Sequence, residues 1–92
     1  MAVTVKIPTP LRKFTADKDA VQVAAGTVEA ALAALDAVAP GIRAKLVDED
    51  GKVRRFINIY AGEDDIRFLD GLQTVVADGG EISIIPAIAG GA

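Results

Sequence analysis

The segment from Val28 to Val38 carries the one convincing amphipathic helix that the sequence predicts. Its apolar side chains recur at a period near 3.6 residues and form a single stripe: Val28, Ala31, Leu32, Leu35 and Val38. Thr27 is the expected N-cap, and Pro40-Gly41 is expected to end the helix. A helix with one apolar stripe must bury it against one face of a sheet, which leaves the other face open. We therefore expect an α+β roll rather than a doubly wound fold.

Several segments predict strands around this helix. Alternating or β-branched and aromatic residues mark the segments 3–7, 20–24, 53–60 and 81–86, and 66–68 predicts a further short strand. The expected sheet is mixed, with four to five strands. In the last strand we expect Ile82 and Ile84 to face the core and Ile85 to face away from it. Residues 42–46 predict one further helical turn, and residues 48–51 and 63–65 predict turns between strands.

Composition removes most kinds of chemistry from the side chains. The chain has no cysteine and no histidine, and its one serine is Ser83. Disulfides, thiolate zinc sites, cysteine nucleophiles and a hydrolytic triad are therefore excluded. The acids at 48–50 lack the spacing of a calcium loop, and those at 63–65 are ordinary for a turn. We expect no catalytic residue and no metal site, so the function must come from shape, backbone or the chain ends.

Length and charge limit the partners. Ninety-two residues suffice for one domain with one modest core. The chain has 10 basic and 13 acidic residues, and the basic ones are scattered among the acids, so we expect no nucleic-acid partner. No basic leader with an apolar core precedes residues 3–7, and no apolar run reaches the roughly 18 residues that cross a bilayer. These features predict a cytoplasmic protein without a membrane partner.

The tail holds one feature that the fold does not require. Gly90-Gly91 follows Pro86 by four residues. Glycine-rich ends are common, so an ordinary chain end is one interpretation. The functional interpretation is that two residues without Cβ can thread a narrow channel and bring a carboxylate into another protein's active site.

Particular motifs in the second half of the chain carry a family resemblance. They are RFINIY at 55–60, DIRF at 65–68, GLQT at 71–74, DGGE at 78–81 and IIPAIAGG at 84–91. With these motifs the whole chain resembles the MoaD/ThiS group of ubiquitin-like sulfur carriers, which have a β-grasp fold. It is most similar to the carriers that feed an O-phosphoserine-dependent cysteine synthase. The resemblance implies a β-grasp domain at residues 1–87 and a flexible Gly-Gly tail at residues 88–92.

The resemblance also implies a mechanism. Gly91 would be the reacting residue: an E1-like enzyme adenylates its carboxylate with ATP-Mg, and a sulfur source then displaces AMP to leave a thiocarboxylate. Ile88, Ala89 and Gly90 would thread the partner's active site. A sulfur-accepting synthase, either a cysteine synthase or the large subunit of molybdopterin synthase, would take the sulfur. The chain itself would bind no cofactor and would not be an enzyme.

Ala92 departs from the family pattern, which ends at Gly-Gly. The extra residue places the needed carboxylate in a peptide bond. We expect a metallopeptidase to remove Ala92, unless this residue is foreign to the natural chain.

The resemblance further implies that the open face of the sheet docks partners. We expect Ile85 at its centre, joined by Phe56, Tyr60 and Phe68 as an apolar patch. The alternative is that Phe56 and Phe68 complete the core.

Other functions remain open at this point. The same chemistry could serve molybdopterin or thiamine synthesis. Alternatively, Gly91 could be conjugated to lysines as in a protein modifier, or the chain could be an interaction domain with an inert tail.

Overall fold

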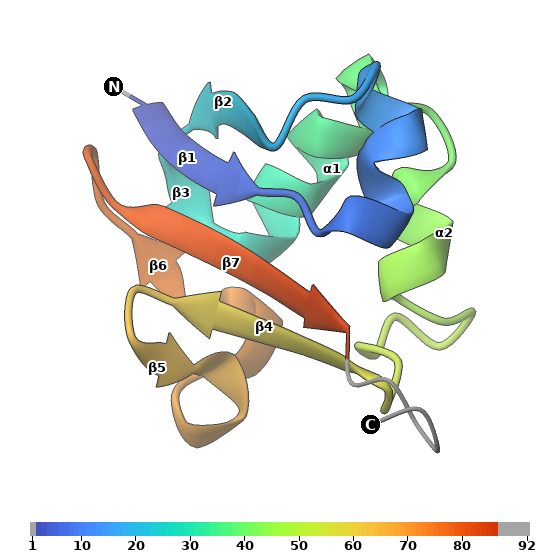
Figure 1. The fold of residues 1–92 in the computed structure, drawn as a ribbon. Helices are drawn as coiled ribbons and strands as arrows, with labels where there is room; N and C mark the ends of the chain where they lie inside the picture. Colours follow the sequence, from blue (N-terminus) through green and yellow to red (C-terminus); the bar gives the residue numbers. More distant parts are fainter. Residues whose placement is uncertain (1, 87–92) are drawn as a thin grey trace.

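The computed structural model describes residues 2–86, and these form an α+β roll built on a five-stranded mixed sheet. The strand order is β2-β1-β7-β4-β5, so the last strand of the chain lies in the centre of the sheet. The helix α1 (Val28–Val38) covers one face of this sheet, and the opposite face carries no helix of comparable length (Figure 1). This arrangement confirms the expected fold class. The expected boundary between domain and tail, after residue 87, lies outside the described residues.

The first two strands form the antiparallel edge of the sheet. The strand β1 (Ala2–Lys6) pairs with β2 (Ala20–Ala24), and the 3₁₀ helix η1 (Thr9–Thr15) connects them. Pro8 and Pro10 border the end of β1, where a residue without an N–H cannot continue the ladder.

The main helix begins as predicted. The Thr27 hydroxyl accepts a hydrogen bond from the Ala30 N–H at 3.1 Å and caps the first turn. The short strand β3 (Gly26–Thr27) before it pairs with β6 (Val75–Val76) and ties the helix start to the second half of the chain.

The apolar stripe of α1 is buried except at its last position. Val28, Ala31, Leu32 and Leu35 all belong to the core, but Val38 is 65% exposed, so its expected place in the stripe was wrong. Ten residues are about 2.8 helical turns, which places Val38 about 80° around the helix from Val28. Ala39, at about three full turns from Val28, is buried in its stead.

A second short helix closes the end of the core. The helix α2 (Ile42–Leu46) buries Ile42 and Leu46, as predicted. Gly41 precedes it with φ = 96°, a conformation that favours glycine. The Asp36 carboxylate accepts hydrogen bonds from the N–H groups of Gly41 and Arg43 and fixes this connection.

The region from 47 to 76 differs most from expectation. The strand β4 covers Ile57–Ala61 only, because Val53 forms an isolated bridge with Val47 instead of extending it. The strand β5 is Asp64–Asp65, where a turn was expected. The expected strand at 66–68 is the 3₁₀ helix η2 (Ile66–Phe68), and a further 3₁₀ helix, η3 (Gly71–Gln73), follows it.

The last strand, β7 (Glu81–Pro86), follows the predicted alternation. Ile82 and Ile84 are buried in the core, and Ile85 faces out. Among residues 2–86 the structure has no helix that is long and apolar enough to cross a bilayer.

Candidate functional site

The path of β7 determines where the tail begins. The strand pairs in parallel with β1 through residues 81–83 and antiparallel with β4 through residues 82–86. The last described residue, Pro86, lies opposite Ile57 at the start of β4. The expected tail residues Ile88, Ala89, Gly90, Gly91 and Ala92 lie outside the described residues. What the structure supplies is therefore the last strand, β7, whose end at Pro86 precedes them in the sequence.

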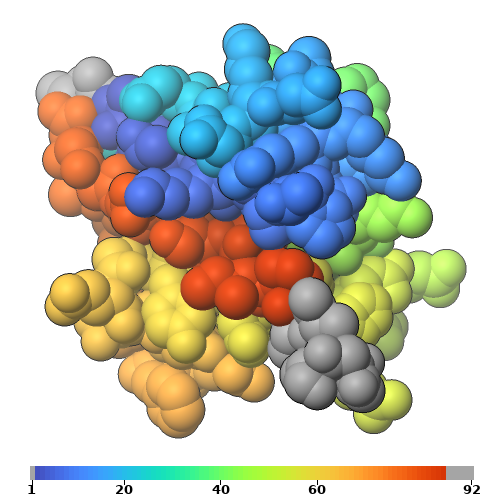
Figure 2. Space-filling model, in the orientation of Figure 1, coloured from blue at the N-terminus to red at the C-terminus, as the bar shows by residue number. Residues whose placement is uncertain are grey.

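Ile85 lies on the open face of the sheet, as expected. It is 45% exposed and lies opposite Asn58 of β4. The neighbouring outward residue of β7 is Ser83, opposite Tyr60. Figure 2 shows this face, with β1, β7 and β4 side by side across it. The face therefore presents an isoleucine among polar or amphipathic neighbours, close to the point where the chain leaves the sheet.

The three aromatic residues expected around Ile85 lie at different places. Phe56, 46% exposed, directly precedes β4 and lies diagonally from Ile85 in the strand register. Tyr60 is half-buried on the same face of β4. Phe68 ends η2 beyond the β5 edge and is 83% exposed. The exposure of Phe56 and Phe68 shows that the alternative, in which both complete the core, was wrong.

An ion pair that the sequence analysis missed lies at the β4–β5 edge of this surface. The Arg67 guanidinium donates to both Asp65 carboxylate oxygens, with a closest contact of 2.7 Å, and to Asn58 Oδ1 at 3.0 Å. Arg67 therefore joins η2 to β4, where it contacts Asn58, the residue opposite Ile85 in the strand register. The only sequence signal was the DIR spacing at 65–67, which alone does not indicate this contact across two strands.

The ion pair shifts both pKa values. Hydrogen bonds from the Arg67 side chain lower the pKa of Asp65 from 3.8, and they outweigh the burial of the carboxyl, which acts in the opposite direction. The Asp65 hydrogen bond raises the pKa of Arg67 in turn. The Asp65 carboxylate also accepts the Arg67 N–H at 2.9 Å and caps η2. Asp65 is thus a structural carboxylate that holds the Arg67 cation against Asn58 on the open face of the sheet.

The acidic turns contribute no metal site among residues 2–86, where no group of three or more candidate ligands converges. The Asp48 carboxylate accepts the N–H groups of Asp50 and Lys52, at 2.9 and 3.0 Å, which makes this segment the turn that was predicted.

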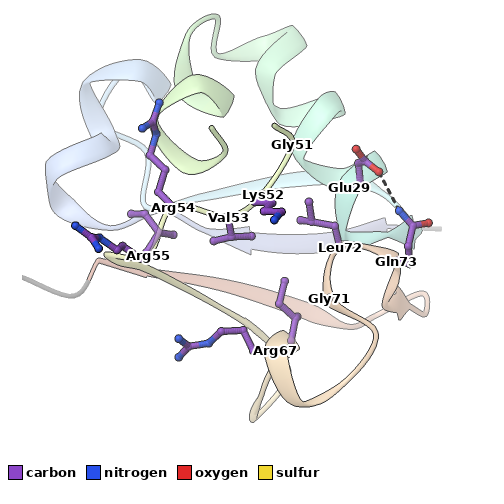
Figure 3. Close-up of a pocket in the computed structure, with 12 residues that line it drawn as sticks. Glu29, Gly51, Lys52, Val53, Arg54, Arg55, Arg67, Gly71, Leu72 and Gln73 are labelled. Atoms are coloured by element: carbon purple, nitrogen blue, oxygen red, sulfur yellow. Dashed lines mark hydrogen bonds between the residues drawn. The ribbon is translucent and has the colours of Figure 1, made fainter. Parts of the chain in front are cut away.

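A hollow of about 410 Å³ lies between α1, the segment 51–55 and η3. Figure 3 shows Arg54 and Arg55 pointing away from Leu72, while the Gln73 amide donates to Glu29 at 3.0 Å at the far end. A small-molecule site usually has a few polar groups that converge on the ligand. The polar groups drawn here diverge or pair with each other, so we assign no reaction to this hollow.

The comparisons with known proteins cover essentially the whole chain. The model of the ThiS family matches residues 5–91. The sulfur carrier protein CysO of Mycobacterium tuberculosis is 44% identical over 93 residues, which cover 99% of this chain and 100% of the relative. A putative sulfur carrier protein of Archaeoglobus fulgidus is 32% identical over 91 residues, covering 99% of this chain and 100% of its own. A chain of the Amycolatopsis orientalis BexX/CysO complex superposes with a TM-score of 0.91 at 43% identity, covering 97% of this chain and 99% of that one.

Proposed function

This chain belongs to the ThiS family and is a sulfur carrier protein, and we propose that it carries the sulfur as a thiocarboxylate on Gly91. The observation that carries the proposal is the extent of the family match, which runs to Gly91 and includes the Gly-Gly motif. The described body is compatible with this role, since it has exposed apolar side chains on and beside the open face of its sheet, and β7 ends at Pro86, five residues before Gly91.

The chemistry explains why an activating enzyme is needed. A carboxylate is a poor electrophile because its charge repels nucleophiles and its leaving group would be oxide. A Gly91 oxygen attacks the α-phosphorus of ATP, pyrophosphate leaves, and the acyl-adenylate forms. Sulfide then attacks the acyl carbon, and AMP leaves with the former carboxylate oxygen. The partner enzyme provides the ATP-Mg site and the positioning, while this chain provides the acyl group.

We infer that the tail reaches the partner's active site through its small residues. Gly90 and Gly91 have no Cβ to obstruct a narrow channel, and Ile88 and Ala89 connect them to the sheet. Ala92 must be removed first, because it holds the Gly91 carbonyl in a peptide bond, and we propose a metallopeptidase for this step. Consumption of ATP is the reason to place the reaction in the cytoplasm.

We further propose that the sulfur is delivered to an O-phosphoserine-dependent cysteine synthase. Support comes from the full-length similarity to CysO, whose 44% identity exceeds the 32% of the second carrier reported above. The open face with Ile85, Phe56, Tyr60 and Phe68 is the surface that we propose for docking, and Arg67 is held there by its hydrogen bond to Asn58.

The test uses the chain ending at Gly91 and the E1-like enzyme of the same organism. Incubation with ATP-Mg and sulfide should raise the intact mass by the difference between sulfur and oxygen. The matched control is the form that retains Ala92, which should stay unchanged. Failure of the trimmed form to gain the sulfur mass would refute the thiocarboxylate.

The receiving pathway is tested separately. The charged carrier should yield cysteine with the purified synthase and O-phosphoserine, and the carboxylate form should yield none. A ladder of conjugates on target lysines would instead support a protein modifier.

A further inference from the structure

A groove of about 560 Å³ opens beside Pro86, where the described chain ends. It exists because β1 leaves the sheet at Lys6, so the second half of β7 has a strand neighbour only on its β4 side. The floor of the groove is apolar: Leu11 of η1 and Ile57 of β4 are buried there, and Phe56 is exposed beside them.

Two cations face this apolar floor. Lys45 of α2 is exposed, and Arg54 is held against α2 by its Nε, which donates to the Ala44 carbonyl oxygen at 3.0 Å. The Arg54 backbone N–H also donates to the Leu46 carbonyl oxygen at 2.9 Å. Within residues 2–86, neither cation forms an ion pair, and the terminal amino groups of Arg54 donate no hydrogen bond. Of the residues that the structure describes, none that lines the groove is acidic.

The opposite end of β7 has the reverse charge. Glu81 begins the strand, and its carbonyl oxygen accepts the Gly62 N–H at 2.8 Å, which brings Glu63 and Asp64 to the same end. The end of β7 at Pro86 thus has a groove whose described charged residues are both cations, in a chain with a net charge of −3, while Asp48 and Glu49 line a neighbouring hollow together with Arg54. Such an end attracts an acidic surface and orients the encounter.

We propose that this groove docks an acidic segment with an apolar tip at the rim of the E1-like enzyme's active-site cleft. The inference rests on the proposed function, since that enzyme must receive Gly91. Five residues lead from Pro86 to Gly91 and span at most about 17 Å when extended. A cleft that encloses them brings its rim against the groove, where carboxylates of the enzyme pair with Lys45 and Arg54.

The test is the charge reversal Lys45→Glu in the chain that ends at Gly91. The readout is kcat/KM for activation of the carrier by the purified E1-like enzyme with ATP-Mg. The reaction is monitored through the release of pyrophosphate, at low and at high salt. We expect a fall of about three- to tenfold at low salt, mainly through KM, and a smaller difference at high salt. The matched control is Lys18→Glu, which makes the same charge change at an exposed lysine between η1 and β2 and should leave kcat/KM unchanged.

The outcomes separate this inference from the function on which it rests. Normal charging of Lys45→Glu would refute the docking role of the groove without contradicting the proposed thiocarboxylate. An equal loss in Lys18→Glu would also overturn it, because net charge alone would then explain the effect. No charging of the unaltered chain would refute the proposed function, and the groove with it. Equal thermal unfolding midpoints of the three proteins would exclude misfolding as the cause.

Discussion

Truncation of Ile85 to alanine should weaken docking without weakening the fold. Full burial of an isoleucine side chain contributes roughly 1.5–3 kcal/mol. Ile85 is 45% exposed in the free carrier, so a partner can bury at most that share of it. The available gain is therefore about 0.7–1.4 kcal/mol. Ile85→Ala should raise the Kd for the E1-like enzyme by about three- to tenfold.

Titration calorimetry of the chain ending at Gly91 measures this Kd directly. The matched control is Val38→Ala at the end of α1, on the side of the molecule that carries the helix. Val38 is 65% exposed, more than Ile85, so a nonspecific effect of apolar loss would be at least as large there. The control should leave Kd unchanged, and both variants should unfold at the temperature of the unaltered chain.

A second substitution at the same position sharpens the test. Ile85→Arg places a cation opposite Asn58, whose Oδ1 already accepts a hydrogen bond from Arg67. An arginine at this position would have to lose its hydration in the interface and offers no apolar side-chain end to bury, so its loss of affinity should exceed that of Ile85→Ala. The reasoning would be refuted if both variants bound as tightly as the unaltered chain, because the open face would then contribute nothing to docking.

Two further predictions concern the body of the carrier. Leu32→Ala should lower the free energy of unfolding by about 2–5 kcal/mol in urea denaturation, because Leu32 is fully buried; a loss below about 1 kcal/mol would mean that the core closes around the cavity. Arg67 holds the pKa of Asp65 in the folded chain below the ordinary value of 3.8. The stability that this ion pair contributes is therefore complete above pH 3.8, and it declines as the pH falls through the lowered pKa of the folded state. Urea unfolding from about pH 5 to about pH 2 should therefore show a steeper loss for the unaltered chain than for Asp65→Asn, and parallel curves would contradict the assignment.

The sequence predicts those helices and strands whose apolar residues follow a regular spacing. The spacing of Val28, Leu32 and Leu35 locates α1, and the alternation of Ile82, Ile84 and Ile85 orients β7. The Gly-Gly tail was a candidate site from its lack of side chains, but glycine-rich ends are common, so the resemblance to a family was needed to favour the functional interpretation.

The segment 64–68 was mispredicted because hydrogen bonding of a side chain overrides strand propensity there. Asp65 accepts the Arg67 N–H and starts a 3₁₀ turn at Ile66, although the sequence DIRF resembles a short strand. The contact of Arg67 with Asn58 depends on the pairing of β4 with β5, which no local pattern specifies. The position of this cation beside Asn58 on the open face could therefore be found only from the structure.

The central position of β7 connects docking to chemistry. Ile82 and Ile84 anchor the strand in the core, while Ile85 and Pro86 reach the open face and the groove. A partner that binds the open face or the groove therefore contacts β7, the strand that precedes the tail in the sequence. Only five residues separate Pro86 from Gly91, so under the proposed function a bound partner would confine the acyl group to a small volume around its active site. Substitutions at Ile82 or Ile84 should act through stability, whereas those at Ile85 or Lys45 should act through delivery of the tail.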